Sequence, residues 1–84
     1  MTYTVTYKPS AERELVDLWI NALDRQEIAD AANRIDSLLR TSPHDQGESR
    51  EQTRILFERP IAAQFEIHDS DNVVEVLKIW RIGH

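Results

Sequence analysis

The chain has 84 residues, of which 40% are hydrophobic and 30% are charged. A chain of this length forms one domain, which we place at residues 1–84, and it buries roughly 60–65% of its unfolded surface. It contains no cysteine, which excludes disulfides, thiolate metal sites and a cysteine nucleophile. Its net charge of −5 argues against tight, sequence-independent nucleic-acid binding, because that affinity comes from neutralised phosphates.

The sequence also lacks the signals of a membrane or exported protein. No apolar run reaches the ~20 residues that a spanning helix needs, and the N-terminus lacks the basic start and apolar core of a signal peptide. We therefore expect a cytoplasmic protein with no membrane partner. His44, His68 and His84 do not have the spacing of metal ligands, so we expect no metal and no cofactor.

The first half of the chain predicts one strand followed by two helices. Threonine alternates with tyrosine and valine in residues 2–7, which is typical of a half-buried strand. Ser10 is the predicted N-cap of a helix that ends near Ala22, and Asp24 with Glu27 resembles a capping box that starts a second helix. Apolar residues at helical spacing predict the buried faces: Leu15, Leu18, Trp19 and Ala22, then Ile28, Ala31, Ala32, Ile35, Leu38 and Leu39.

The second half predicts a loop and three strands. Pro43 follows the second helix, and we expect a polar loop from residue 44 to residue 52. Residues 54–58, 61–68 and 73–81 are strand candidates separated by short turns. In the last of them we expect two partly covered faces, one with Val73, Leu77 and Ile79 and the other with Val74, Val76 and Trp80.

These elements predict an α+β fold of order β-α-α-β-β-β, in which a helical hairpin packs on a four-stranded, mainly antiparallel sheet. If each element reverses the direction of the previous one, the first strand runs opposite to the last. The two can then pair side by side and complete an antiparallel sheet.

Several local patterns together resemble one family. The tyrosine-rich first strand, the segment KPSAEREL at residues 8–15, the paired helices and the segment VLKIWR at residues 76–81 are similar to the RelE/ParE superfamily, the toxins of type II toxin-antitoxin systems. The resemblance implies growth inhibition, a cognate antitoxin as partner, and a role such as plasmid stabilization. RelE-like members are mRNA interferases that cleave messages on the ribosome, whereas ParE-like members poison DNA gyrase and have no nuclease site.

The resemblance also implies candidate catalytic residues. Metal-independent RNA cleavage needs a proton acceptor, cations on the phosphate and an acid for the leaving oxygen. Arg54 and Arg81 match positions where relatives carry basic residues, Glu48 lies where some relatives place a catalytic glutamate, and His84 lies near a terminal histidine or tyrosine. The alternative, in which they have no catalytic role, is that both arginines are solvated or paired with nearby glutamates.

The sequence differs from the RNA-cutting members of this family at one position, and this difference leaves three functions possible. RNA-cutting relatives carry an arginine where this chain has Ala62, and losing one charge-stabilising donor typically costs ~10²–10³ in rate. The first hypothesis is an endoribonuclease that acts on the ribosome and mRNA through Arg54, Arg81, Glu48 and His84. The second is a gyrase inhibitor without nuclease activity. The third is a non-toxic module that keeps the fold and binds the antitoxin.

Overall fold

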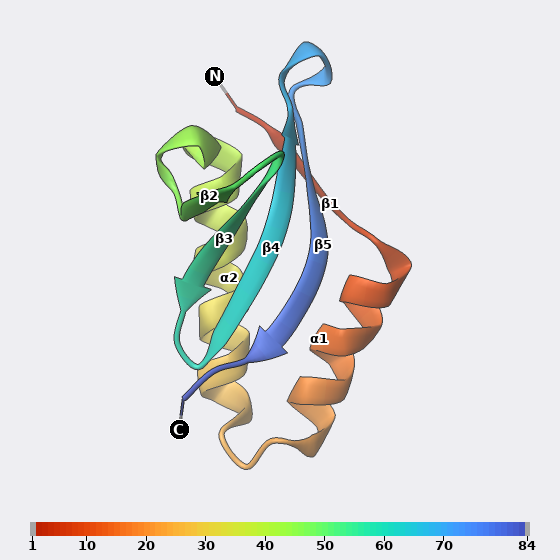
Figure 1. Cartoon of the computed structure of the whole chain (residues 1–84). Helices are drawn as coiled ribbons and strands as arrows, with labels where there is room; N and C mark the ends of the chain where they lie inside the picture. The colour runs from red at the N-terminus through yellow and green to blue at the C-terminus, as the bar shows by residue number, and fades with distance from the viewer. Residues whose placement is uncertain (1, 84) are drawn as a thin grey trace.

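The computed structural model describes residues 2–83 as two helices and five strands with two short 3-10 turns (Figure 1). In chain order the elements are β1 (Thr4–Tyr7), α1 (Pro9–Asn21), α2 (Arg25–Thr41), the 3-10 turn η1 (Pro43–Asp45), β2 (Glu48–Arg50), β3 (Thr53–Glu58), β4 (Ile61–His68), the 3-10 turn η2 (Asp69–Asp71) and β5 (Val73–Arg81). The predicted α+β class with a helical hairpin is confirmed.

The strands form one mixed sheet of order β1-β5-β4-β3-β2. The pairings of β2 with β3, β3 with β4 and β4 with β5 are antiparallel, and the pairing of β1 with β5 is parallel. The prediction that the first strand lies beside the last is therefore right in position and wrong in direction.

The direction of β1 differs because its connection to α1 does not turn back. Only Lys8 separates Tyr7, the last residue of β1, from Pro9, the first residue of α1. Proline is favoured at the first helical position, because its ring fixes a helical φ and the missing N–H needs no partner there. The helix thus starts at Pro9, ahead of the expected cap at Ser10, and α1 continues downward from β1 (Figure 1). The chain therefore first reverses its direction between α1 and α2.

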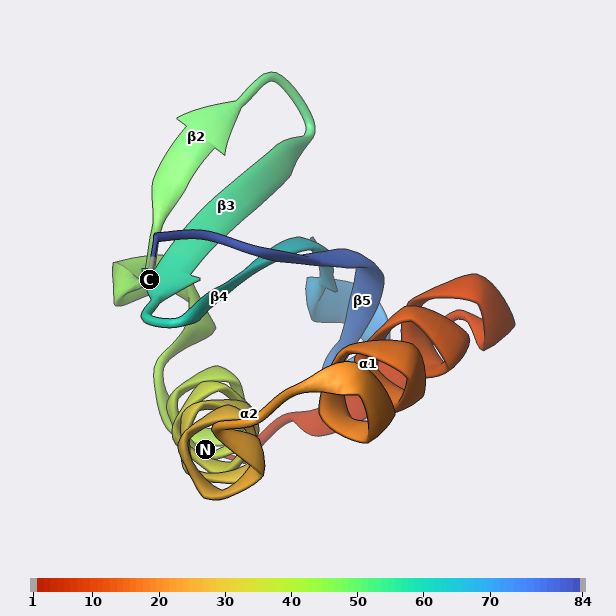
Figure 2. The ribbon, with the colours of Figure 1, turned by 90° about the horizontal axis from the view of Figure 1, so that it is seen from below.

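Both helices lie on one side of the sheet, and the other side carries no helix among the described residues (Figure 2). We call the uncovered side the open face. Between the helices and the sheet lies a core of buried apolar side chains: Ala11, Ile28, Ala31, Ile35, Leu39, Leu56, Ile61, Ala63, Phe65, Val74, Val76 and Ile79. The apolar stripe predicted for α2 supplies four of these residues, which explains how the helix is held on the sheet.

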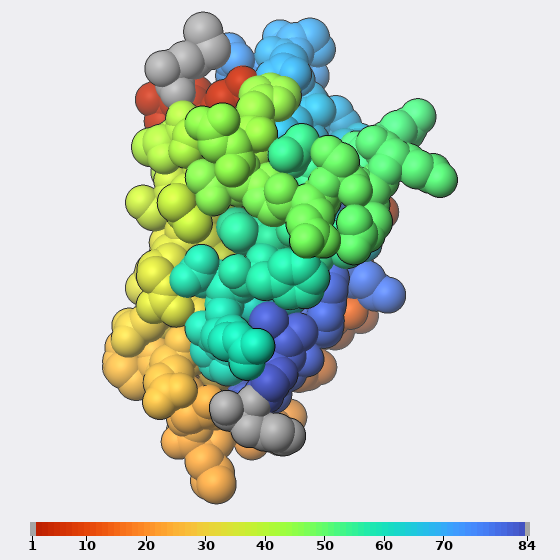
Figure 3. All heavy atoms as spheres, turned by 60° about the vertical axis from the view of Figure 1, so that its left-hand side comes forward, coloured from red at the N-terminus to blue at the C-terminus, as the bar shows by residue number. Residues whose placement is uncertain are grey.

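A short edge strand, β2, was expected to be loop. Its residues Glu48 to Arg50 are all exposed, so they lack the apolar alternation that marks a strand. Gly47 has a φ of +72° and passes so close to the backbone of Ile55 that a Cβ would collide with it, which allows the chain to enter the pairing with β3. The resulting hairpin projects from the rest of the molecule (Figure 3).

A β-bulge in β5 changes which side chains share a face. Gln64 pairs with Lys78 and Phe65 pairs with Val76, so Leu77 is the extra residue. Val76 and Ile79 therefore both point toward the helices, where both are buried. The expected strict alternation, which put Ile79 with Leu77 and opposite Val76, is wrong at this position.

Candidate functional site

Arg54 lies at the start of β3 and points toward the helical side of the sheet. It is opposite Phe65, which is buried in the core, and residues directly opposite each other share a face. Its Nε donates a hydrogen bond to the backbone oxygen of Gln46 at 2.8 Å, and its Nη1 donates to Ser49 Oγ at 3.2 Å. The guanidinium thus fastens the chain before β2 to the sheet.

Glu48 lies on the edge strand β2, opposite Ile55. Its carboxylate accepts a hydrogen bond from Arg50 Nη2 at 3.1 Å, and its side chain is 61% exposed. Since Ile55 and Arg54 are successive residues, their side chains leave opposite faces of β3, and Glu48 shares the face of Ile55. Glu48 and Arg54 therefore belong to the same hairpin but do not point to a common centre.

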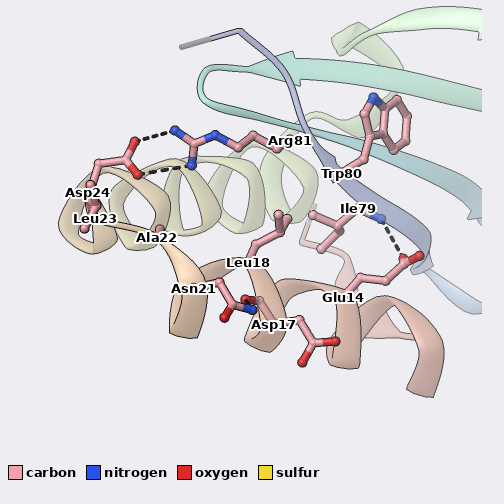
Figure 4. A pocket seen from close by; sticks show the side chains of 10 residues that line it. All are labelled: Glu14, Asp17, Leu18, Asn21, Ala22, Leu23, Asp24, Ile79, Trp80 and Arg81. Atoms are coloured by element: carbon pink, nitrogen blue, oxygen red, sulfur yellow. Dashed lines mark hydrogen bonds and ion pairs between the residues drawn. The ribbon is translucent and has the colours of Figure 1, made fainter.

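Arg81 ends β5 and forms a bidentate ion pair with Asp24, the residue before α2 (Figure 4). Its Nη1 and Nη2 donate to the two carboxylate oxygens at 3.1 and 2.9 Å. The hydrogen bond from Arg81 lowers the pKa of Asp24, and the same bond raises the pKa of Arg81. The pair ties the end of the sheet to the connection between the helices.

The structure does not bring Arg54 and Arg81 together. Arg81 is opposite Ile61, which is opposite Glu58, so Arg81 lies level with the end of β3 while Arg54 lies at its start. Four residues of strand separate the two levels, or about 13 Å at ~3.3 Å per residue. His84, the fourth predicted catalytic residue, lies outside the described residues.

Ala62 points to the open face and is nevertheless fully buried. It stands between Phe57 on β3 and Trp80 on β5, which are its direct neighbours in the register. Phe57 is itself half-exposed, and Lys78 is exposed on the same face. At the position where the resemblance implied an arginine, this chain therefore has an apolar strip with one lysine beside it.

A second apolar surface lies on the helices. Val16, Trp19 and Ile20 of α1 are 48%, 44% and 51% exposed, and they line a groove whose opposite wall includes Ala29 and Asn33 of α2. We call this the α1–α2 groove. Trp19 was expected in the core, but it lies at the groove, where the guanidinium carbon of Arg25 is 5.2 Å from its ring centroid. This exposed surface could have been predicted from Val16 and Ile20, because these two apolar residues widen the apolar stripe of α1 beyond its buried side.

A polar cluster joins the start of β1 to the two 3-10 turns. Asp69 accepts a hydrogen bond from the Tyr3 hydroxyl at 2.9 Å, and its carboxylate lies 2.7 Å from His44 Nε2. These contacts, first that of His44 and then that of Tyr3, lower the pKa of Asp69. Within residues 2–83 no three His, Asp or Glu side chains are arranged to hold a metal ion. None of the described helices is long and apolar enough to cross a membrane.

Comparison with known proteins identifies the fold through solved structures. No protein-family model matches the chain, and no curated protein matches its sequence. A chain of the RelBE2 toxin-antitoxin complex from Mycobacterium tuberculosis superposes with a TM-score of 0.76 at 20% identity, covering 96% of this chain and 92% of that one. A chain of the chromosomal ParDE system of P. aeruginosa gives 0.72 at 15% identity, covering 98% of both chains.

A third similar structure comes from an archaeon. A chain of the RelE-RelB complex from Pyrococcus horikoshii OT3 gives a TM-score of 0.70 at 15% identity, covering 100% of this chain and 99% of that one. The fold expected from the resemblance, that of the RelE/ParE toxin structures, is confirmed. RelE and ParE structures match about equally well, so the fold does not choose between the two expected activities.

Proposed function

We propose that this protein is the toxin of a toxin-antitoxin pair and that its antitoxin covers the α1–α2 groove. The observation that carries the proposal is the exposure of Val16, Trp19 and Ile20 side by side on a small acidic domain. Contiguous apolar surface of this kind marks an interaction site, since a monomeric protein gains nothing by leaving it in water. The likeness to chains from RelBE2, ParDE and RelE-RelB systems supports an antitoxin as the partner.

The shape of the groove suits a helix of the partner. Leu15, Ile28 and Ala32 line it together with the exposed residues of α1, so its lining is almost entirely apolar. Small side chains on α2, Ala29 and Ala32, let another backbone approach closely. An amphipathic helix with apolar residues at helical spacing would fill such a groove.

The arrangement of the candidate catalytic residues favours inhibition of a target such as DNA gyrase over RNA cleavage. Cleavage requires the cations and the proton-transfer groups to meet at one phosphate. Arg54 lies at the start of β3, whereas Arg81 ends β5 level with the other end of β3. Arg54 is engaged by Gln46 and Ser49, and Arg81 by Asp24. A non-toxic antitoxin-binding module would share this arrangement.

Ribosome-dependent RNA cleavage remains the second candidate, and the open face is the observation that favours it. Phe57 and Trp80 flank Ala62 there, with Lys78 on the same face. Aromatic rings beside a cation are a common platform for stacking single-stranded bases. In this case the open face, and not the pair Arg54 and Arg81, would contact the message.

Co-expression with the antitoxin-like gene, to be sought next to the gene for this chain, tests whether the partner is an antitoxin. We expect capture of either protein to recover both, with nanomolar affinity, equivalent to ~12 kcal/mol. Ile20→Asp should weaken the complex at least tenfold, because it places a charge against an apolar partner. Ser37→Asp is the control for the added charge, since Ser37 is exposed on α2 and does not line the α1–α2 groove. Recovery of this chain alone, or equal binding by the two variants, would contradict the proposal.

A further inference from the structure

The edge strand β2 ends the sheet on the side opposite to β1, and no strand pairs with its outer side in the described structure. Its three residues, Glu48, Ser49 and Arg50, are all exposed. β2 also lies away from both helices, so neither helix covers this edge (Figure 2). Within its bounds it has no proline, lysine or bulge, which are common protections of an edge strand. An exposed edge of this kind can pair with a strand of another chain.

The backbone groups of Ser49 point to this outer side. Only two residues separate β2 from β3, so Arg50 and Thr53 are the first and last residues of a tight turn and form a hydrogen-bonded pair. Hydrogen-bonded and non-hydrogen-bonded pairs alternate along an antiparallel ladder, so the next pair, Ser49 with Arg54, is not hydrogen-bonded. In agreement, the Ser49 backbone oxygen accepts a hydrogen bond from a side chain, Arg50 Nη1, at 3.2 Å. The backbone N–H and oxygen of Ser49 can therefore pair with a further strand.

The charges of β2 are arranged about Ser49 so that the strand complements itself. Glu48 and Arg50 lie on either side of Ser49 and share one face of the strand. When two β2 strands pair in antiparallel register centred on Ser49, each Glu48 lies opposite the Arg50 of the other copy. Opposite charges directly across a strand pair are stabilising, and like charges are destabilising. A wholly acidic or wholly basic strand would meet one repulsive contact at this edge, whereas a second copy of β2 meets none.

We propose that two copies of this chain pair through β2, in antiparallel register about Ser49, and join their sheets into one continuous sheet. The N–H of each Ser49 donates to the Ser49 backbone oxygen of the other copy. Arg50 releases the oxygen of Ser49 and exchanges Glu48 of its own chain, which is 3.1 Å away, for Glu48 of the other copy. The dimer does not depend on an antitoxin, because β2 does not line the α1–α2 groove.

The dimer should be weak and should depend on protein concentration. A pairing of three residues buries far less than the roughly 1,200 Å² of a stable interface. Each chain also has a net charge of −5, so two copies repel each other at long range. We therefore expect monomers at micromolar concentration and dimers as the concentration approaches millimolar.

Charge reversal on the two sides of Ser49 tests the pairing in the purified full-length chain. Glu48→Arg gives the edge two cations and Arg50→Glu gives it two carboxylates, so like charges oppose each other in either homodimer. Sedimentation equilibrium should show a dissociation constant at least tenfold higher for each variant than for the wild type. An equimolar mixture of the two variants should dimerise at least as strongly as the wild type, because cations then meet carboxylates. That recovery also shows that both variants are folded.

Glu12→Arg is the matched control for Glu48→Arg. It makes the same change of charge at an exposed residue of α1, away from β2. It should not weaken the dimer, since it only reduces the net negative charge of the chain.

The backbone contact is tested at Ser49 itself. Ser49→Pro removes the outward N–H, which β3 does not use, so it should abolish the dimer and leave the circular dichroism of the monomer unchanged. In the wild type, the amide resonance of Ser49 should shift as protein concentration rises. A chain that stays monomeric at millimolar concentration, a dimer that persists in Ser49→Pro, or a variant mixture that does not recover the dimer would overturn the proposal. A dimer that Ile20→Asp removes and the charge reversals preserve would also overturn it, since the copies would then meet at the α1–α2 groove.

Discussion

Asp24 takes the position of an N-cap at α2, but its carboxylate is used elsewhere. The capping-box pattern correctly located the start of the helix, which begins at Arg25. The side chain makes no capping hydrogen bond and pairs with Arg81, 57 residues further along the chain. A bidentate bond to a guanidinium is stronger than a bond to a neutral amide, so the long-range partner prevails over the local one. Arg81 was predicted for a phosphate site, and the structure gives it a protein partner.

The Asp24–Arg81 pair should make stability depend on pH. Because the folded pKa of Asp24 is lowered, its contribution is present above the unfolded pKa, ~3.9, and is lost as pH falls through the folded value. Asp24→Asn should therefore lower the urea midpoint at pH 7 by a small amount, since the pair is partly exposed. That difference from wild type should shrink steadily below pH ~4.

Asp17→Asn is the control for this measurement, since Asp17 forms no ion pair among the described residues. An Asp24→Asn difference that stays constant between pH 7 and pH 3 would show that packing or backbone effects, and not the ion pair, cause the loss. Arg81→Ala combined with Asp24→Asn should cost less than the sum of the two single changes, because both remove the same interaction.

Among the elements, those with regular apolar spacing could be predicted from the sequence and those without it could not. β4 and β5 have the predicted bounds, and α1 and α2 agree to within one or two residues at their ends. β2 was missed because an exposed three-residue edge strand is defined by its backbone pairing with β3 and not by its side chains. The bulge at Leu77 was missed for the same reason, since it exists only relative to β4.

The two phenylalanines of β3 and β4 test how the sheet contributes to stability. Phe65 is fully buried against the helices, so Phe65→Ala should destabilise the protein by ~3–5 kcal/mol, a large part of the stability of so small a domain. Phe57 is 49% exposed on the open face, and Phe57→Ala should cost about 1 kcal/mol or less. Urea unfolding followed by circular dichroism measures both. Equal losses would mean that the open face is covered as well as the core.

For the whole molecule, the sequence predicted the fold, but it did not predict how far apart Arg54 and Arg81 lie. The four candidates were chosen by their place along the chain, and distance across a sheet depends on register. Arg54 and Arg81 come to lie about 13 Å apart along the strands only because β3 and β5 both run antiparallel to β4. The local sequence around each arginine carries no information about that offset.

The way in which the protein stops growth tests whether Arg54 and Arg81 act separately or on one phosphate in the intact cell. We expect induction of the wild-type chain without its antitoxin to stop growth while translated messages stay intact and a DNA-damage response appears. Purified protein should then reduce the supercoiling activity of gyrase. Arg54→Lys, which keeps the charge but changes the donor geometry toward Gln46 and Ser49, should leave messages equally intact.

Message breaks that appear with the wild type and disappear with both Arg54→Lys and Arg81→Lys would mean that the two arginines do act on one phosphate. The sheet would then have to rearrange on the ribosome, and the endoribonuclease would become the primary function.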